Sequence, residues 1–238
     1  MSKLLIGIGT GRNGSKSLAH FLNAQPRINF THEECALAMD SVLCTFPKAL
    51  STLEGLQGDD YLYHGDIAPF WIYYMGELIT LYPDVRIIWL RRKPIGSVIQ
   101  SFFSYIRIAA SQDQFPKYGW YPIGEEKFSH AAISRAVKKN EWLNEVCARM
   151  YPDNVLELRT DQLNIEECQY QVLDWLGIPV GEHVYGMPHL NKREERVSWA
   201  TKNESEEINL KSFRTPGELR PTLEGLLDGT SEHTVTSG

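Results

Sequence analysis

The chain is poor in cysteine, and its few cysteines are scattered. Four occur in 238 residues, and no two have the C-x-x-C spacing of a metal site: Cys35, Cys44, Cys147 and Cys168. This pattern excludes the common zinc sites. A chain of this length can bury a sizeable core, so it does not need a disulfide scaffold. We therefore expect reduced thiols and a cytoplasmic protein.

The sequence also lacks an excess of positive charge and any long apolar run. Its net charge of −6 is atypical of nucleic-acid-binding proteins, so no nucleic-acid partner is expected. No run of 18 apolar residues occurs, so no membrane span is expected. The first strand is expected to begin at residue 3 or 4, so no signal peptide is expected. No internal repeat is present.

Apolar segments instead alternate with helical patterns along the chain. Strands are predicted at 4–8, 27–31, 61–67, 85–90 and 154–158, and helices at 15–24, 35–43, 70–82, 94–109, 125–150 and 161–176. This alternation predicts an α/β fold of three layers, with a central parallel sheet covered by helices on both faces. Residues 111–124 are interpreted as a loop or lid. We expect one domain over 1–200 and a partly mobile extension over 201–238.

A glycine-rich loop joins the first strand to the first helix. Gly9, Gly11 and Gly14 follow the apolar run, and the helical pattern starts directly after them. The free N–H groups and the dipole of a helix start favour an anion at such a place. Arg12 and Lys16 lie where that dipole would repel cations, which indicates that a multiply charged anion binds between them.

The spacing of this loop differs from that of a nucleoside triphosphatase. Four residues separate Gly9 from Gly14, but Ser15 stands where the Walker A pattern has lysine. The run 85–90 is followed by Arg91 and Arg92, where a magnesium-binding aspartate would be needed. Both features count against ATP or GTP hydrolysis.

Three stretches together resemble the sulfotransferase family. Gly9–Leu18 is similar to its 5′-phosphosulfate loop, Arg86–Phe102 to its 3′-phosphate segment, and Val155–Leu163 with Leu173–Pro179 to its late strand and helix. The resemblance covers about residues 3–180. It implies a P-loop-like fold and transfer of a sulfuryl group from 3′-phosphoadenosine 5′-phosphosulfate (PAPS), leaving 3′,5′-ADP, with no metal.

The resemblance also implies which residues bind the donor. The phosphosulfate loop would be Gly11, Arg12, Asn13, Gly14, Ser15, Lys16 and Ser17. Arg12 would stabilise charge on the oxygen that leaves sulfur. Arg92 would bind the 3′-phosphate together with Ser101, with Ser97 as the alternative. Asn191, Lys192 and Arg193 would stand in for the segment that covers the adenine.

A general base must take the proton of the acceptor. Glu33, His64 and Asp66 follow or end predicted strands, so we expect them at the same sheet edge as Arg12 and Arg92. Glu33 and Asp66 rank level as catalytic base, and His64 comes behind them. Either carboxylate could instead cap a helix.

The acceptor is predicted only as a class. The resemblance implies a hydroxyl or amine on a small molecule, a glycan, a lipid or a tyrosine side chain. The oligomeric state is not indicated. Two alternatives remain open: a small-molecule or nucleotide kinase that uses the same loop, and a non-catalytic nucleotide-binding module.

Overall fold

A five-stranded parallel sheet forms the centre of the protein. The computed structural model describes residues 2–37, 46–111 and 130–186. The strands are β1 (Lys3–Ile8), β2 (Ile28–His32), β3 (Tyr63–Ile67), β4 (Arg86–Arg91) and β5 (Val155–Arg159), in the order β2-β3-β1-β4-β5. All neighbouring strands are parallel, so their carboxyl ends meet at one edge.

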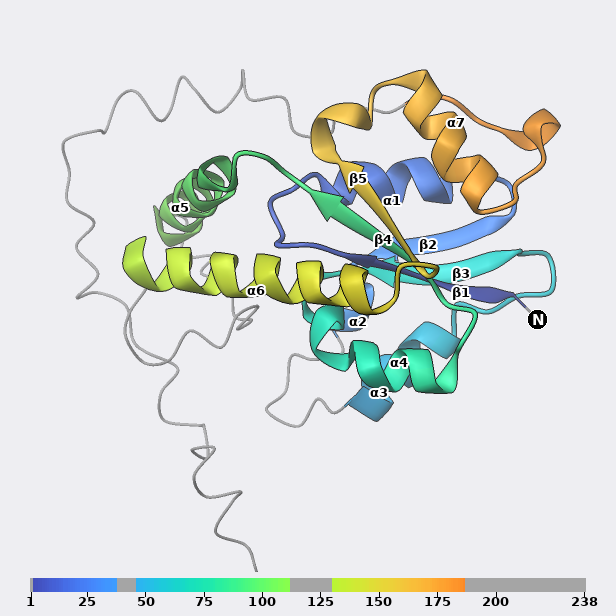
Figure 1. Ribbon diagram of the computed structural model, residues 1–238, viewed down its shortest axis with the longest axis horizontal. Coiled ribbons are helices and arrows are strands. Elements are labelled where there is room, and N and C mark those ends of the chain that lie inside the picture. Colours follow the sequence, from blue (N-terminus) through green and yellow to red (C-terminus); the bar gives the residue numbers. More distant parts are fainter. Residues whose placement is uncertain (1, 38–45, 112–129, 187–238) are drawn as a thin grey trace, which may run out of the picture. The chain divides into compact units, whose positions relative to one another are not determined.

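Helices cover both faces of this sheet (Figure 1). The helices α1 (Ser15–Asn23) and α7 (Glu166–Trp175) lie on one face, and α3 (Phe46–Glu54), α4 (Met75–Leu81) and α6 (His130–Met150) lie on the other. Two separate clusters of buried side chains fill the space between the layers. The predicted three-layer α/β architecture is confirmed.

The apolar run of β1 is explained by burial on both faces. Leu5 belongs to the cluster beneath α1 and α7. Leu4, Ile6 and Ile8 belong to the cluster on the opposite face. Because successive residues of a strand point to opposite faces, a strand buried on both sides needs a continuous apolar sequence.

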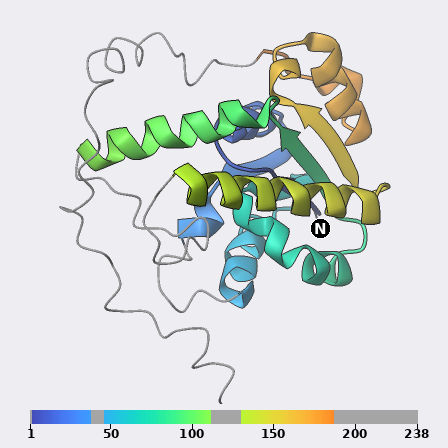
Figure 2. The same ribbon diagram turned by 60° about the vertical axis from the view of Figure 1, so that its left-hand side comes forward.

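Two helices extend side by side past the carboxyl edge of the sheet (Figures 1 and 2). They are α5 (Ile95–Ser111), which follows β4 directly, and α6, which returns toward the sheet. A third apolar cluster joins them, made of Val98, Ile99, Phe102, Ile133 and Val137. The start of α5 therefore lies beside the ends of β1 and β4.

Two predicted helices begin differently from their sequence pattern. The stretch 70–82 divides into a 3₁₀ helix, η1 (Pro69–Tyr74), and then α4. Likewise, the stretch 161–176 begins with the 3₁₀ turn η2 (Thr160–Gln162) before α7. The 3₁₀ form of η1 buries four consecutive residues, Pro69 to Ile72, which an α-helix on a sheet surface would not do.

The remaining described helices are short. They are α2 (Glu34–Leu37) and η3 (Val180–Glu182). The predicted lid 111–124 lies outside the described residues save for Ser111, the last residue of α5. The extension 201–238 and its boundary at residue 200, as well as Asn191, Lys192 and Arg193, lie entirely outside them. Within the described ranges, no helix is long and apolar enough to cross a membrane.

Candidate functional site

The loop from Gly9 to Gly14 has a backbone that few residues other than glycine adopt. Gly9, Gly11 and Gly14 have φ angles of 156°, 70° and 88°, and Arg12 between them has φ 54°. Gly14 caps α1, and its carbonyl accepts the N–H of Ser17 at 3.0 Å. The N–H groups before Ser17 belong to the helix start, where intrahelical acceptors are missing. They are the groups for which the sequence predicts an anion cradle.

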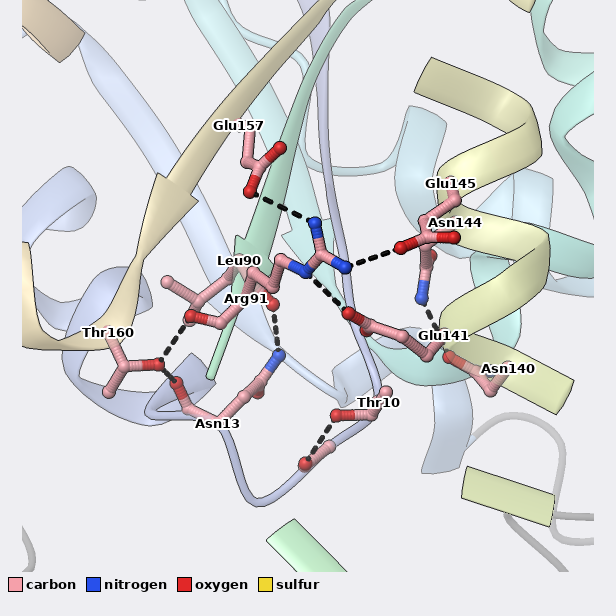
Figure 3. Close-up of polar contacts among 11 residues, drawn as sticks. Thr10, Asn13, Leu90, Arg91, Asn140, Glu141, Asn144, Glu145, Glu157 and Thr160 are labelled. Atoms are coloured by element: carbon pink, nitrogen blue, oxygen red, sulfur yellow. Dashed lines mark hydrogen bonds and ion pairs between the residues drawn. The ribbon is translucent and has the colours of Figure 1, made fainter. Parts of the chain in front are cut away.

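Hydrogen bonds to the ends of β4 and β5 hold this loop (Figure 3). The Asn13 amide nitrogen donates to the carbonyl of Leu90 at 2.6 Å. The Thr160 hydroxyl lies 2.5 Å from the Asn13 carbonyl and 3.2 Å from that of Arg91. The Asn13 side chain is thus buried in the protein, and its backbone carbonyl accepts the Thr160 hydroxyl. The sequence reading missed Thr160, although a threonine directly after a strand is a usual turn signal.

The structure brings Arg12, Arg92 and Ser101 together. An Arg92 guanidinium nitrogen (Nη1) donates to the Arg12 carbonyl at 3.0 Å. The Arg12 Nε lies 3.4 Å from the Ser101 hydroxyl, and its guanidinium stacks 4.7 Å from the centre of the Tyr105 ring. Two predicted anion-binding arginines and one of the two candidate serines therefore share one location beside the loop.

Arg91, next in sequence to Arg92, has a different environment (Figure 3). Its guanidinium pairs with Glu141 at 2.6 Å, with Glu157 at 3.3 Å and with Glu145. It also lies 4.5 Å from the centre of the Trp89 ring. Arg91 thus joins β4 to β5 and α6, and its charge is compensated inside the protein.

A cavity of about 590 Å³ opens beside Arg92. Its wall includes Lys93, Lys138 and Trp142 as well as the Glu141 and Glu145 that pair with Arg91. Because Glu141 and Glu145 are paired with Arg91, the remaining charged groups of the wall are the cations Arg92, Lys93 and Lys138.

Glu33 directly follows β2, which lies on the other side of β1 from β4 and Arg92 in the sheet. It has φ 60°, so it shares the left-handed backbone with Arg12, and its side chain is 14% exposed. Burial is the main cause that raises the pKa of Glu33 to about 8; the charge of Asp66 adds to the rise, and Arg12 opposes it. A carboxyl group whose pKa is raised in this way is a candidate for a catalytic acid or base.

Asp66 is fully buried and accepts three hydrogen bonds. They come from the Thr31 hydroxyl at 2.8 Å, the Trp71 indole at 3.0 Å and the backbone N–H of Glu34 at 3.3 Å. Burial raises the pKa of Asp66, while these hydrogen bonds lower it. The carboxylate joins β2, β3, η1 and the start of α2, so it has a structural role.

His64 does not lie at the predicted edge. It pairs with Leu4 near the start of β1, and its Nδ1 lies 2.9 Å from the Ser2 hydroxyl. The expectation that His64 shares the site with Arg12 was wrong, because β3 starts at Tyr63 and His64 is its second residue. Asp66 lies one residue before the end of the same strand.

The sequence reading gave no role to His32, the last residue of β2. Its Nε2 lies 3.0 Å from the Ser15 hydroxyl and 3.7 Å from a Glu33 carboxylate oxygen. Burial and the charges of Lys16 and Arg12 lower the pKa of His32 to about 4, so the imidazole is neutral. The one sequence signal that could have identified His32 as a candidate site residue is its position at a strand end, next to Glu33.

A glycine loop at the carboxyl edge of a parallel sheet, between helical layers, defines a P-loop-like α/β protein. A model of the sulfotransferase family matches residues 50–182, more than half of the chain. The chain belongs to the sulfotransferase family. Among curated proteins, none matches the sequence significantly.

Two solved structures share the fold at low sequence identity. A sulfotransferase from Alicyclobacillus acidocaldarius is 14% identical with a TM-score of 0.52, covering 85% of this chain and 92% of that one. The sulfotransferase domain from the curacin biosynthetic pathway is 16% identical with a TM-score of 0.50, covering 75% of both chains. At such identities the likeness concerns the fold.

Proposed function

We propose that the protein transfers the sulfuryl group of PAPS to a hydroxyl or amine acceptor. The observation that carries this proposal is the meeting of Arg12 and Arg92 beside the start of α1. Two arginines and a helix N-terminus provide separate positions for two anionic groups of one ligand. Sulfotransfer from PAPS requires such a pair, because its donor carries a 5′-phosphosulfate and a 3′-phosphate.

The residues around the loop fit this donor by their chemistry. The N–H groups at Gly14, Ser15 and Lys16 would bind the 5′-phosphate, with the hydroxyls of Ser15 and Ser17 beside them. Gly11 and Asn13 would contribute through the loop backbone. Arg92 and Ser101 would bind the 3′-phosphate, with Ser97 as the alternative to Ser101; the Ser101 hydroxyl lies 3.4 Å from the Arg12 Nε. When bound, PAPS supplies a sulfuryl group on a good leaving group.

Glu33 is the general base that the geometry favours. The Asp66 carboxylate is already engaged, because its oxygens accept three hydrogen bonds within the protein, whereas the Glu33 carboxylate lies 3.7 Å from the His32 Nε2. Glu33 would take the acceptor proton while the acceptor oxygen or nitrogen bonds to sulfur. The bond from sulfur to the phosphate oxygen breaks, and Arg12 stabilises the electron pair left on that oxygen. Such a transfer needs no metal.

Nucleotide binding provides the first test of the donor. We expect 3′,5′-ADP to bind without metal and more tightly than ATP with magnesium, in titration calorimetry. The reverse preference would instead support a small-molecule or nucleotide kinase. Loss of 3′,5′-ADP binding in Arg92→Ala, with little change in Lys93→Ala, would locate the binding at this edge.

The catalytic base is tested by comparing Glu33→Gln with Asp66→Asn. With PAPS and a panel of hydroxyl and amine acceptors, Glu33→Gln should lower kcat by about 10²–10⁴-fold, the usual contribution of a general base. Asp66→Asn should lower the stability of the protein but keep measurable transfer, because Glu33 remains in place. If the wild type binds 3′,5′-ADP but transfers sulfate to no acceptor, the chain is a non-catalytic nucleotide-binding module.

The acceptor class and the cellular location are further parts of the proposal. A small molecule, a glycan, a lipid or a tyrosine side chain would each present a suitable nucleophile to Glu33. A cytoplasmic location agrees with the unpaired thiols of Cys35, Cys147 and Cys168.

A further inference from the structure

One side of helix α5 faces the glycine-rich loop. Ser101, Phe102 and Tyr105 lie on this side, because their spacing places them within about 100° of one another around the helix axis. The Ser101 hydroxyl lies 3.4 Å from Arg12 Nε, and the Arg12 Cζ lies over the Tyr105 ring, 4.7 Å from its centre. The Arg12 side chain therefore extends from the loop along α5.

Packing fixes the position of α5 against the loop. A Cβ atom at Gly11 would lie 3.2 Å from the end of the Phe102 ring, so the loop backbone passes close to the helix. Phe102 is buried in the apolar cluster that joins α5 to α6. Tyr105 is partly buried and packs against the same cluster. The ring beneath Arg12 is consequently supported by two helices.

The contact between Arg12 and Tyr105 differs in kind from the contacts of Arg91. Three glutamates pair with Arg91 and compensate its charge. The Tyr105 ring attracts a cation through its quadrupole and carries no net charge. This contact therefore restrains the Arg12 guanidinium without compensating its positive charge.

Such a restraint matters for an arginine that binds an anion. A long side chain has many rotamers, and fixing one of them upon binding costs conformational entropy. A side chain that is restrained before the ligand arrives avoids part of this cost, and its charge is at a defined position when the reaction starts.

We propose that Tyr105 is a positioning residue that holds the Arg12 guanidinium in place for the anion bound by the loop. The aromatic ring carries this role, and the hydroxyl does not. The catalytic consequence rests on the proposed sulfotransfer, in which Arg12 stabilises the charge on the oxygen that leaves sulfur. The restraint itself concerns any anion at the loop.

Binding of inorganic pyrophosphate and of 3′,5′-ADP, measured by titration calorimetry, tests the role of the ring. Tyr105→Leu should weaken both by about 3–10-fold, the size of a cation–π contact at a partly buried site. Tyr105→Phe keeps the ring and should bind like the wild type. Phe103→Leu is the matched control, because Phe103 packs on the same cluster but its ring lies against His130 of α6. No loss in Tyr105→Leu, or an equal loss in Phe103→Leu, would overturn the inference.

A double-mutant cycle without ligand shows whether Tyr105 acts through Arg12. The four proteins are the wild type, Arg12→Gln, Tyr105→Leu and the double variant, and denaturant unfolding gives the equilibrium constant of each. Tyr105→Leu should raise the unfolding constant about 3–10-fold more in the wild type than in Arg12→Gln. Equal effects in the two backgrounds would contradict a role through Arg12.

Kinetics with PAPS separate this inference from the proposed function. Tyr105→Leu should lower kcat by about 10–100-fold, the effect of a displaced catalytic group, and Tyr105→Phe should restore it. If binding and the cycle behave as expected but the wild type transfers no sulfate, the sulfotransfer is refuted and the role of Tyr105 in anion binding stands. Failure of 3′,5′-ADP to bind, with the expected pyrophosphate response, would refute the PAPS assignment alone.

Discussion

The Arg92 guanidinium donates a hydrogen bond to the backbone carbonyl of Arg12, 3.0 Å away. One arginine of the site thus supports the loop that carries the other. The contact crosses from the end of β4 to the loop after β1, which are neighbouring strands of the sheet. A substitution at Arg92 consequently removes a positive charge and also loosens the conformation of the loop.

Arg92→Ala should weaken 3′,5′-ADP binding by about 10–100-fold, the range expected for one charge-assisted hydrogen bond to a phosphate. Titration calorimetry measures the change. Thr160→Val is the control for loop support, because it removes the hydroxyl that lies near the carbonyls of Asn13 and Arg91 without removing a charge. Equal losses in both variants would mean that Arg92 acts only on the loop.

Arg91→Ala should lower the free energy of unfolding by about 1–3 kcal/mol, because it leaves three carboxylates without their cation and only that of Glu141 is largely buried. The carboxylates are those of Glu141, Glu145 and Glu157. Denaturant unfolding measures this loss. Arg159→Ala is the matched control: its ion pair with Asp161 is exposed, so it should cost less than about 1 kcal/mol. A similar cost at both positions would contradict the structural role of Arg91.

The contrast between these two arginines shows where sequence reasoning stops. The apolar runs of β1 and β4 and the glycine loop predict the sheet and its anion-binding edge, because burial on both faces and positive φ angles leave local signals. The sequence Arg91-Arg92 gives no such signal. What separates the two side chains is a pair of glutamates on α6, some fifty residues later.

The choice among the candidate bases depended on where each strand ends, which the sequence does not fix to the residue. A strand end read from sequence is uncertain by a few residues. Asp66 lies near the end of β3, whereas His64 lies at its start beside Ser2. Glu33 and His32 became distinguishable from ordinary polar residues only through burial, since their pKa shifts depend on the loop and β3 packed around them.

The stability of the protein should depend on pH through Glu33. Its pKa is raised from 4.5 to about 8, so between these values the folded protein keeps a proton that the unfolded chain has lost. The free energy of unfolding should therefore fall as pH rises through this window. Glu33→Gln, which is neutral at every pH, should match the wild type near pH 4 and be more stable by a few kcal/mol near pH 9, on the order set by the shift.

Urea unfolding at a series of pH values measures this difference. Glu34→Gln is the control, because Glu34 is the next residue in sequence but is exposed. It should follow the wild-type curve. Parallel curves for the wild type and Glu33→Gln between pH 5 and pH 8 would show that Glu33 has an ordinary pKa.

Backbone strain at the two central residues gives the last prediction. Arg12 and Glu33 are the only residues other than glycine with positive φ in the described ranges, at 54° and 60°. Left-handed backbone costs a residue with a Cβ atom roughly 1–2 kcal/mol, and glycine avoids this cost. Glu33→Gly should therefore be more stable than Glu33→Ala by about 1 kcal/mol, and the same order should hold at Arg12.

At Lys139, exposed in the middle of α6, the order should reverse, because glycine is about 1 kcal/mol worse than alanine inside a helix. Denaturant unfolding of the six variants, glycine and alanine at each of the three positions, measures these differences in the free energy of unfolding. If glycine were the less stable choice at all three positions, Arg12 and Glu33 would carry no strain, and their unusual conformation would not distinguish them from other loop residues.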